Sequence, residues 1–516
     1  MSGCRRSRDT GARILANGHT NAIVSVMVRA AALTPAPGES EAPVSTASDR
    51  ESAGTARFRL GGAGVAAPTL DPTLDPIFEP ALDEVGGGVI TRGGRTPGGP
   101  PGGRRPSWRE VRTFSSLGVP SFRWFYGSMV GQMAAMQVEM VARGVLIYDI
   151  TGSGTILGVM ALAQSLPMLF ASFIGGVMAD RIPKKQVMLV GMVSNAVIAG
   201  GIAVAIALGF VSSGNASLAV WILVIAGALK GSVQGMLMPA RQSIIPELVS
   251  REQIMNAMAL NNLGMNVLRF TAPALAGYAI VWWGYESVYF IMTALFVIAS
   301  LFALGLPRTP VAAAPGRGRA IHDVMGGFQY ARREPTIALI LGFTLFVVLC
   351  SMPYMMLLPI FTEDVLHKGA AGMGILVSVS GIGAIVGSLV LASLPNKRRG
   401  VMLIVSSLVL GLALMVFAFS TSWPLSLAAI VFVGLGQTGR MTLSGTLLQH
   451  YVEDAYRGRV MAIYMMEFGL TSLSVFVAGI SADYIGIQWS IGGLALVLVA
   501  VTSAVWVFSP RLRALD

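Results

Sequence analysis

The sequence predicts an all-α membrane protein with twelve transmembrane helices arranged as two six-helix pseudo-repeats. From Trp108 onward, apolar runs of the roughly 20 residues needed to cross a bilayer follow one another with short breaks. The cations of this region lie in alternate links, and two of those links resemble each other. Composition agrees, because 54% of residues are hydrophobic, only 12% are charged and the mean hydropathy is +0.67. A soluble chain this apolar could not cover its surface with polar groups.

Residues 1–106 have a different character. They are rich in Gly, Pro and Ser, repeat Leu70-Asp-Pro as Leu74-Asp-Pro, and end in a Gly/Pro/Arg run from Gly86 to Pro106. Such a composition cannot bury enough apolar surface to fold. We therefore expect a disordered, Gly/Pro-rich cytoplasmic tail.

The rest of the chain divides at its longest link. We expect an N-terminal six-helix half at 107–306, a cytoplasmic linker at 307–335 and a C-terminal six-helix half at 336–516. Within the linker, Ala320 to Arg333 could form a short surface helix, with Phe328 and Tyr330 available to touch lipid. The twelve expected spans are 121–148, 153–178, 186–209, 217–239, 255–282, 286–306, 336–359, 371–394, 401–419, 423–448, 460–482 and 488–508.

Orientation follows from the positive charges in the links. The links on the side of the N-terminus carry Arg181, Lys184, Lys185, Arg241, Arg251, Arg308, Arg317, Arg319, Arg332, Arg333, Lys397, Arg398, Arg399, Arg457 and Arg459. The alternate links carry only Lys368. Since cytoplasmic loops concentrate Lys and Arg, we expect a multi-pass protein of the inner membrane with both termini in the cytoplasm.

Two links after corresponding spans resemble each other. Pro183-Lys-Lys-Gln-Val-Met-Leu follows the second span, and Pro395-Asn-Lys-Arg-Arg-Gly-Val-Met-Leu follows the eighth. Repeated halves around a central site are a common plan of secondary transporters, so this similarity favours the same plan here.

The link after the second span reads Gly176-Val-Met-Ala-Asp180-Arg181-Ile-Pro-Lys184-Lys185. Glycine lets a neighbouring helix approach, the carboxylate of Asp180 suits a facing helix N-terminus or cation, and the three cations hold the link at the cytoplasmic face. The pattern resembles the loop between the second and third helices of the major facilitator superfamily, with Pro183 where that family usually has Gly. The resemblance implies the major facilitator fold and a gating role for these residues.

Three further passages resemble the branch of that superfamily which includes the enterobactin exporter and related efflux proteins. They are Pro239 to Asn261, Leu357-Leu-Pro-Ile-Phe, and Arg457-Gly-Arg-Val-Met-Ala-Ile-Tyr464. The resemblance implies a secondary transporter that alternates between inward-open and outward-open forms and exports small molecules. Only part of the antiporter proline signature is present, as Ala272-Pro273-Ala-Leu-Ala-Gly277 without the preceding spaced glycines.

Six ionisable residues lie within the expected spans: Glu139, Arg143, Lys230, Arg269, Arg440 and Glu467. Each would cost on the order of 3 kcal/mol facing lipid, so each should face the bundle interior or a partner. Arg440 and Glu467 lie at similar depth and are expected to form an ion pair. Glu139, Lys230 and Arg269 lie near the middle of the membrane and are candidates for the substrate cavity, to which Gln137 and Gln234 could add hydrogen bonds. The alternative is that all of these charges are interhelical struts.

The charge balance favours an acidic substrate. The six residues comprise four cations and two carboxylates, so pairing leaves positive charge uncompensated. If Glu139 neutralises one of Lys230 and Arg269, an anionic substrate can neutralise the other. Glu139 is then the candidate for proton coupling.

Other functions lack the residues they need. No H-E-x-x-H, G-x-S-x-G or Walker pattern is present, and Cys4 and Cys350 make neither a disulfide framework nor a metal site. We therefore expect no enzyme activity, no cofactor, no metal and no nucleic-acid partner. The expected partners are a small-molecule substrate, protons and the lipid bilayer, with the protein a monomer. The alternatives are a lipid or lysolipid transporter and a non-transporting membrane scaffold with the same fold.

The predicted topology can be tested with single cysteines in a background without Cys4 and Cys350. Cysteines replacing Ser213 and Ser422 should react with an impermeant thiol reagent from outside, because both lie in outer links. Cysteines replacing Gln186 and Asn396 should not react in intact cells. Reaction at position 396 from outside would contradict the twelve-span topology.

Overall fold

The computed structural model describes residues 115–307, 320–395 and 397–516, with side chains apart from 173–174, 176–181, 320–324 and 468. All regular secondary structure of these residues is helical. The prediction of a disordered tail at 1–106 lies outside the described residues.

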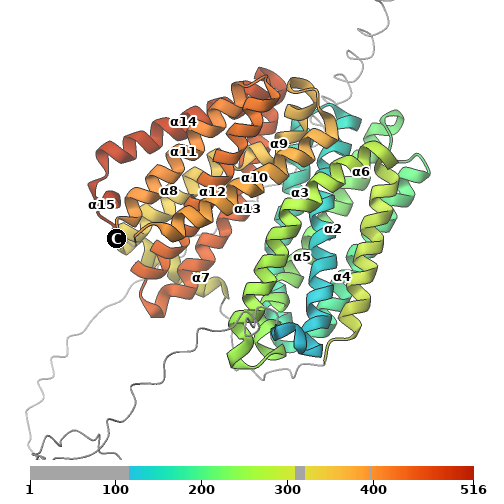
Figure 1. Cartoon of the computed structure of the whole chain (residues 1–516), viewed down its shortest axis with the longest axis horizontal. Coiled ribbons are helices and arrows are strands. Elements are labelled where there is room, and N and C mark those ends of the chain that lie inside the picture. Colours follow the sequence, from blue (N-terminus) through green and yellow to red (C-terminus); the bar gives the residue numbers. More distant parts are fainter. Residues whose placement is uncertain (1–114, 308–319, 396) are drawn as a thin grey trace, which may run out of the picture. The chain divides into compact units, whose positions relative to one another are not determined.

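The helices fall into two groups in the order of the chain, and the groups pack against each other through α3 with α13 and α6 with α10. The first helix group, drawn from blue to yellow in Figure 1, comprises α2 (Pro120–Thr151), α3 (Gly154–Arg181), α4 (Lys184–Ala207), α5 (Ala216–Leu248) and α6 (Ile254–Leu304). The second helix group comprises α8 (Pro335–Ser351), α9 (Pro353–Ile360), α10 (Gly369–Ser393), α11 (Arg399–Phe419), α12 (Trp423–Tyr451), α13 (Asp454–Ile485) and α14 (Ile487–Phe508). Shorter pieces are the 3-10 turns Ser115–Gly118, Ser213–Asn215 and Arg251–Gln253, the linker helix α7 (Ala320–Arg333), the π-helical turn η5 (Phe361–Val365) and α15 (Pro510–Arg513).

Nine helical stretches of the described chain are long and apolar enough to cross a membrane. One of them, Arg251–Leu304, contains a break at Gly284, whose φ of 74° and ψ of 172° are not helical. Glycine tolerates this backbone conformation because it has no Cβ. Gly284 lies between the predicted fifth and sixth spans.

The helix bounds differ from the predicted spans mainly at two places. The fourth span was expected to end at 239, but α5 continues through Pro239 and Pro246 to Leu248. Each proline removes one backbone donor, and the surrounding turns maintain the helix. The eleventh span was expected to begin at 460, but α13 begins at Asp454, because its first turns are polar and lack an apolar signal.

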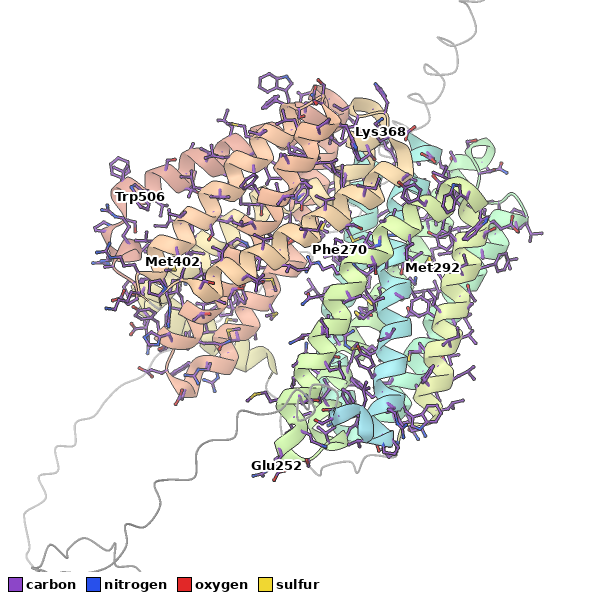
Figure 2. The ribbon with its side chains drawn as sticks, viewed as in Figure 1. Glu252, Phe270, Met292, Lys368, Met402 and Trp506 are labelled. Atoms are coloured by element: carbon purple, nitrogen blue, oxygen red, sulfur yellow. The ribbon has the colours of Figure 1, made fainter. Side chains whose placement is uncertain are left out.

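The helix ends define two ends of the bundle. We call the end that carries Lys184, Lys185, Arg251, Arg398 and Arg457 the basic end, and the end that carries Asp149, Asp364 and Asp483 the acidic end. In Figure 2, Glu252 lies at the basic end and Lys368 lies toward the opposite end.

Contacts between the two groups lie from the acidic end to the middle of the helices. A Cβ on Gly479 of α13 would lie 2.2 Å from the carbonyl oxygen of Gly154 of α3. On the other side of the bundle, a Cβ on Gly374 of α10 would lie 2.3 Å from the carbonyl oxygen of Pro273 of α6. A larger side chain at either position would clash, so glycine is required for these close backbone approaches. Small residues are common where membrane helices meet, because apolar lipid gives helices no hydrophobic reason to associate.

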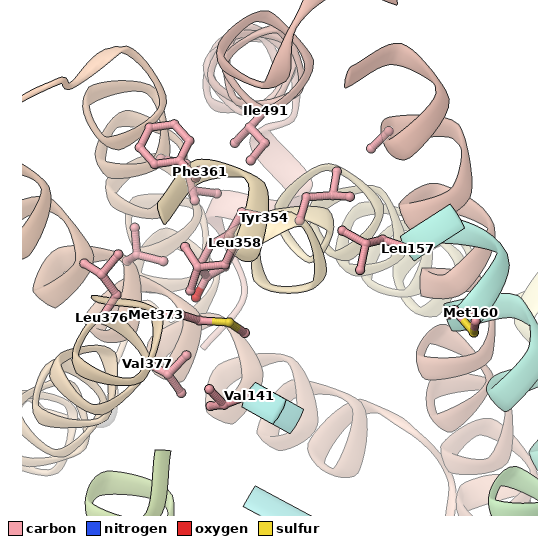
Figure 3. Close-up of a cluster of buried hydrophobic side chains, with 14 of the residues drawn as sticks. Val141, Leu157, Met160, Tyr354, Leu358, Phe361, Met373, Leu376, Val377 and Ile491 are labelled. Atoms are coloured by element: carbon pink, nitrogen blue, oxygen red, sulfur yellow. The ribbon is translucent and has the colours of Figure 1, made fainter. Parts of the chain in front are cut away.

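An apolar cluster fills the space between these contacts. Figure 3 shows Val141 of α2 and Leu157 of α3 near Leu358 of α9 and Met373 of α10, all of them buried. Tyr354 and Phe361 belong to the same cluster. Dense apolar packing from both groups excludes water at this level of the bundle.

The linker helix α7 occupies the predicted range, Ala320–Arg333, and one of its two aromatic side chains packs against α13. Tyr330 stacks on Tyr456 of α13 with ring centroids 4.2 Å apart, and its hydroxyl accepts a hydrogen bond from the backbone N–H of Glu453 at 3.3 Å. The aromatic partner on α13 thus leaves Tyr330 only partly available to lipid. Phe328 remains 44% exposed.

Candidate functional site

A buried ion pair joins α2 and α5. Lys230 Nζ lies 2.5 Å from Glu139 Oε2, and the side chains are only 5% and 11% exposed. Lys230 Nζ has no other polar partner among the described residues. Each charge therefore depends on the other, since an isolated ion in such an interior would be strongly disfavoured.

Aromatic groups from the second part of α6 surround this pair. Lys230 Nζ lies 5.2 Å from the centre of the Phe296 ring, within the range of a cation–π interaction. The hydroxyl of Tyr289 is buried nearby without a hydrogen-bond partner in the described chain. Tyr289 could therefore donate to a water, a proton carrier or a ligand that reaches the pair.

Arg143 of α2 lies close to the pair but has a neutral partner. Its guanidinium donates a hydrogen bond to the side-chain oxygen of Gln164 of α3. It lines a small pocket together with Met140, Met160 and Met355. Polarizable, flexible methionines adapt to ligands of varied shape.

In the second helix group, Arg440 and Glu467 lie next to each other. Arg440 Nη1 is 3.9 Å from Glu467 Oε2, which joins α12 to α13. The other carboxylate oxygen, Oε1, accepts a hydrogen bond of 2.7 Å from the Thr344 hydroxyl of α8. Arg440 is 1% exposed, and its Nε and Nη1 have no hydrogen-bond partner in the described chain. This pair is looser than the Glu139–Lys230 pair.

Arg269 occupies a different environment. It is exposed and lines a pocket of about 150 Å³ with Asn266 of α6, Ser388 of α10 and Thr438 and Thr442 of α12. No carboxylate of the described residues lies within ion-pair distance of it. Because this pocket joins α6 to α10 and α12, Arg269 lies at the junction of the two helix groups, as does the neighbouring Phe270 in Figure 2.

The glutamines differ in what the structure shows of them. Gln137 and Gln234 are half-buried on α2 and α5, the two helices that carry the ion pair. Gln132 is fully buried, and neither atom of its amide has a hydrogen-bond partner in the described chain. A buried amide without a hydrogen-bond partner costs free energy, so Gln132 is a candidate to bind a ligand or a water molecule. The sequence alone could not show that this side chain is buried.

The gating motif is described only in part. Lys184 pairs with Glu247 and donates a hydrogen bond of 3.1 Å to the carbonyl oxygen of Ser243. Lys185 donates to the carbonyl oxygens of Leu304 and Leu306, each at 2.6 Å. Both lysines thus tie the start of α4 to the ends of α5 and α6. The structure does not describe the side chains of Asp180 and Arg181 or the surroundings of Gly176.

A carboxylate at the acidic end joins the two groups. Asp483 of α13 accepts hydrogen bonds from the Ser153 hydroxyl at 2.7 Å and from the backbone N–H groups of Gly154 and Thr155 at 2.7 and 3.0 Å. It therefore caps the N-terminus of α3, where the helix dipole favours negative charge. Sequence reasoning missed this contact, although an aspartate in the link after the eleventh span was a signal.

A second hydrogen bond at the acidic end also crosses between the groups. The Tyr148 hydroxyl of α2 donates to Asp364 Oδ2 at 2.5 Å, and Tyr285 donates to Asp149 within the first group. The Tyr148–Asp364 bond and the bonds of Asp483 thus hold the two groups together at this end.

In the described chain, no group of three or more His, Cys, Asp or Glu side chains could hold a metal ion. The interior holds one close and one loose ion pair, both buried, while the half-buried Arg143 and the exposed Arg269 make no ion pair with the described residues. Such an arrangement can bind a charged organic molecule and exchange a proton.

Known proteins resemble this chain over the described helices. The sequence profile of a family described as "Transmembrane secretion effector" matches residues 111–516. The staphyloferrin A transporter of Staphylococcus aureus (strain NCTC 8325 / PS 47) is 22% identical over 396 residues, which is 76% of this chain and 95% of that protein. The enterobactin exporter EntS of Citrobacter koseri is 26% identical over 388 residues, which is 75% of this chain and 88% of that protein.

Solved structures show the same fold. A crystal structure of a mutant of the nucleoside transporter NupG superposes with a TM-score of 0.62 at 14% identity, covering 74% of this chain and 99% of that one.

The Glu139–Lys230 pair can be tested by a double-mutant cycle on purified protein. Lys230→Met leaves a buried carboxylate without its partner, and removing one member of such a pair costs on the order of 3–5 kcal/mol. Adding Glu139→Gln should recover most of the lost thermal stability, because both charges are then gone. Arg269→Met serves as the control and should change the unfolding temperature little. Additive losses from the two changes would show that the charges do not act as a pair.

Proposed function

Since this chain belongs to the transmembrane secretion effector family of the major facilitator superfamily, we propose that it exports a small organic anion in exchange for protons. Members of this superfamily are transporters rather than enzymes, and the chain is a multi-pass inner-membrane transporter of small molecules. Its export direction is proposed from the relatives named exporters, and its substrate charge from the interior described above.

We propose twelve spans in two six-helix halves. The nine apolar stretches of the described chain become ten when Arg251–Leu304 is divided at Gly284. α2 and α12 supply two more, since they are 32 and 29 residues long and need about 20 to cross. Both carry interior charges or polar groups that reduce their hydropathy.

We propose that the basic end faces the cytoplasm and that the structure represents an inward-facing state. Lys184, Lys185 and Arg398 lie at the basic end, as the positive-inside rule requires of a cytoplasmic face. The hydrogen bonds of Tyr148 and Asp483 join the groups at the acidic end. An exporter would receive its substrate in this state and release it after the acidic end opens.

The negative charge of the substrate is proposed from the guanidinium of Arg269, which makes no ion pair with the described residues. Glu139 is already engaged by Lys230, and Glu467 by Thr344 and Arg440. Among the described residues, no interior carboxylate therefore remains to neutralise Arg269, which is exposed and lines a pocket between the groups. An acidic substrate would supply the missing charge, with Lys230, Gln137 and Gln234 as further candidate contacts.

Glu139 is the proposed coupling carboxylate. If it takes up a proton, Lys230 loses its counter-charge, and the positive charge available to a substrate changes. The affinity of Glu139 for a proton would then depend on whether substrate is bound, and the affinity for substrate would depend on that proton. The buried hydroxyl of Tyr289 and the guanidinium of Arg143 lie close enough to influence that exchange.

The gating motif is proposed to close the basic end in the opposite state. Gly176 would permit close helix approach, and Asp180, next to Arg181, would pair across to the second group, while Lys184 and Lys185 brace the link as observed. Asp180→Asn should therefore weaken the outward-open state and lower transport with little loss of folded protein. Transport by proteoliposomes containing equal amounts of each protein measures this. A normal rate would mean that the motif serves only topology.

The substrate class can be identified by thermal shift of purified protein against mono-, di- and tricarboxylates, with tetraphenylphosphonium as the opposite charge. A ligand at about 100 times its Kd should stabilise by roughly 2.7 kcal/mol. We expect acids to stabilise, Lys230→Met and Arg269→Gln to weaken that effect, and Glu139→Gln to remove its pH dependence before it removes binding.

A preference for tetraphenylphosphonium that survives Lys230→Met and Arg269→Gln would contradict the charge argument. Stabilisation by neither class would favour the non-transporting scaffold.

A further inference from the structure

Two tyrosines of α6 lie on one stripe that begins at the acidic end. Tyr285 donates a hydrogen bond to Asp149, which lies near the end of α2. At 100° per residue, Tyr289 lies about 40° from Tyr285 around the helix and about 20° from Phe296. At 1.5 Å per residue, Tyr289 lies about 6 Å deeper than Tyr285 and about 10 Å short of Phe296. The stripe therefore leads from Asp149 into the bundle.

The deep end of this stripe lies at the Glu139–Lys230 pair. Phe296 packs against Lys230, whose Nζ lies 5.2 Å from the centre of the ring. Along α2, Glu139 is about 15 Å farther from the acidic end than Asp149, at 1.5 Å per residue. Along α6, Phe296 is about 16 Å farther from that end than Tyr285. The stripe thus connects the same two depths as α2 does.

Exposure to solvent falls along the stripe. Asp149 is exposed, Tyr285 is half-buried, and Tyr289 is 1% exposed. The Tyr289 hydroxyl has no hydrogen-bond partner in the described chain, yet it lies close enough to Glu139 and Arg143 for their charges to act on it. A buried hydroxyl without a partner costs free energy. The cost is explained if this hydroxyl relays a proton, because a hydroxyl can accept one proton and donate another.

The space between the helix groups is filled differently. An apolar cluster that includes Val141, Leu157 and Met373 excludes water there, toward the acidic end (Figure 3). The stripe on α6 lies within the first helix group instead. A proton could therefore pass along it while the two groups remain in contact.

We propose that Asp149, Tyr285 and Tyr289 form the route by which a proton from the acidic end reaches Glu139. This proposal rests on the proposed proton coupling at Glu139 and identifies where that proton enters. Asp149 takes a proton from water and donates it to the Tyr285 hydroxyl, which passes its own proton toward Tyr289. The Tyr289 hydroxyl accepts that proton and donates its own to the carboxylate of Glu139. Each tyrosine gains one proton as it loses one, so neither becomes charged, and water bridges hydroxyls that are not in direct contact.

The charged groups at the deep end tie the use of this route to substrate. Lys230 and Arg143 are the cations beside Glu139, and Lys230 holds its carboxylate in the present state. In the proposed function an acidic substrate draws Lys230 away, and the carboxylate is then free to take the proton. At the entrance, Tyr285 and Glu363 of η5 are the titratable groups beside Asp149.

Infrared spectroscopy of the full-length protein in phosphatidylcholine nanodiscs can test the route without a known substrate. The carboxyl band that appears on acidification and is missing from Glu139→Gln reports the proton on Glu139. After rapid mixing with heavy water, the shift of this band gives the rate at which that proton exchanges. We expect Tyr289→Phe to slow the exchange at least about tenfold, because the relay hydroxyl is lost. Tyr278→Phe is the matched control, since it makes the same change on α6 at a residue that is 41% exposed, and it should exchange normally.

Asp149→Asn and Tyr285→Phe test the entrance and should slow the exchange as Tyr289→Phe does. Tyr289→Phe should not lower thermal stability, because its hydroxyl has no partner in the described chain, so slower exchange would report the relay. Normal exchange in Tyr289→Phe would overturn the route. Slow exchange there with normal exchange in both entrance variants would overturn its start at the acidic end. In either case Glu139 remains the coupling carboxylate, whereas a Glu139→Gln variant that loses no band at any pH would overturn the proposed coupling as well.

Discussion

An ionised side chain inside a bilayer must be compensated by a partner, and this constraint organises the interior of the protein. Lys230 and Glu139 meet at 2.5 Å, and this contact fixes α5 against α2. Arg440 and Glu467 meet at 3.9 Å and fix α12 beside α13, with Thr344 satisfying the second oxygen of Glu467. Two carboxylates cannot neutralise four cations, so Arg143 and Arg269 remain to interact with neutral groups or a substrate.

Contacts between the helix groups use a different kind of interaction. At the acidic end the backbones of α3 and α13 approach at Gly154 and Gly479. Asp483 accepts hydrogen bonds from backbone N–H groups at the N-terminus of α3. Apolar side chains from α2, α3, α9 and α10 exclude water beneath this contact. A transporter must be able to break such a contact, and a cap of hydrogen bonds can be exchanged for water when the groups separate.

Two pockets meet where α10 and α12 contact each other. Arg399 and Arg269 lie in pockets that share Ser388 and Thr442, and neither arginine makes an ion pair with the described residues.

The sequence by itself determined the class of fold, most helix bounds to within a few residues and the superfamily, because hydrophobic length, charged links and local motifs are properties of adjacent residues. The end of α5 and the start of α13 were missed by more, since prolines and polar residues there interrupt the apolar signal. It also identified Glu139, Lys230, Arg440 and Glu467 as candidates, since an ionisable residue in an apolar run stands out. The choice of Lys230 rather than Arg269 as the partner of Glu139 was decided only by tertiary structure, as were the capping role of Asp483, the Tyr330–Tyr456 stack and the position of Arg399 in a pocket. These depend on which faces of distant helices meet, and that packing is not encoded in the spacing of neighbouring residues.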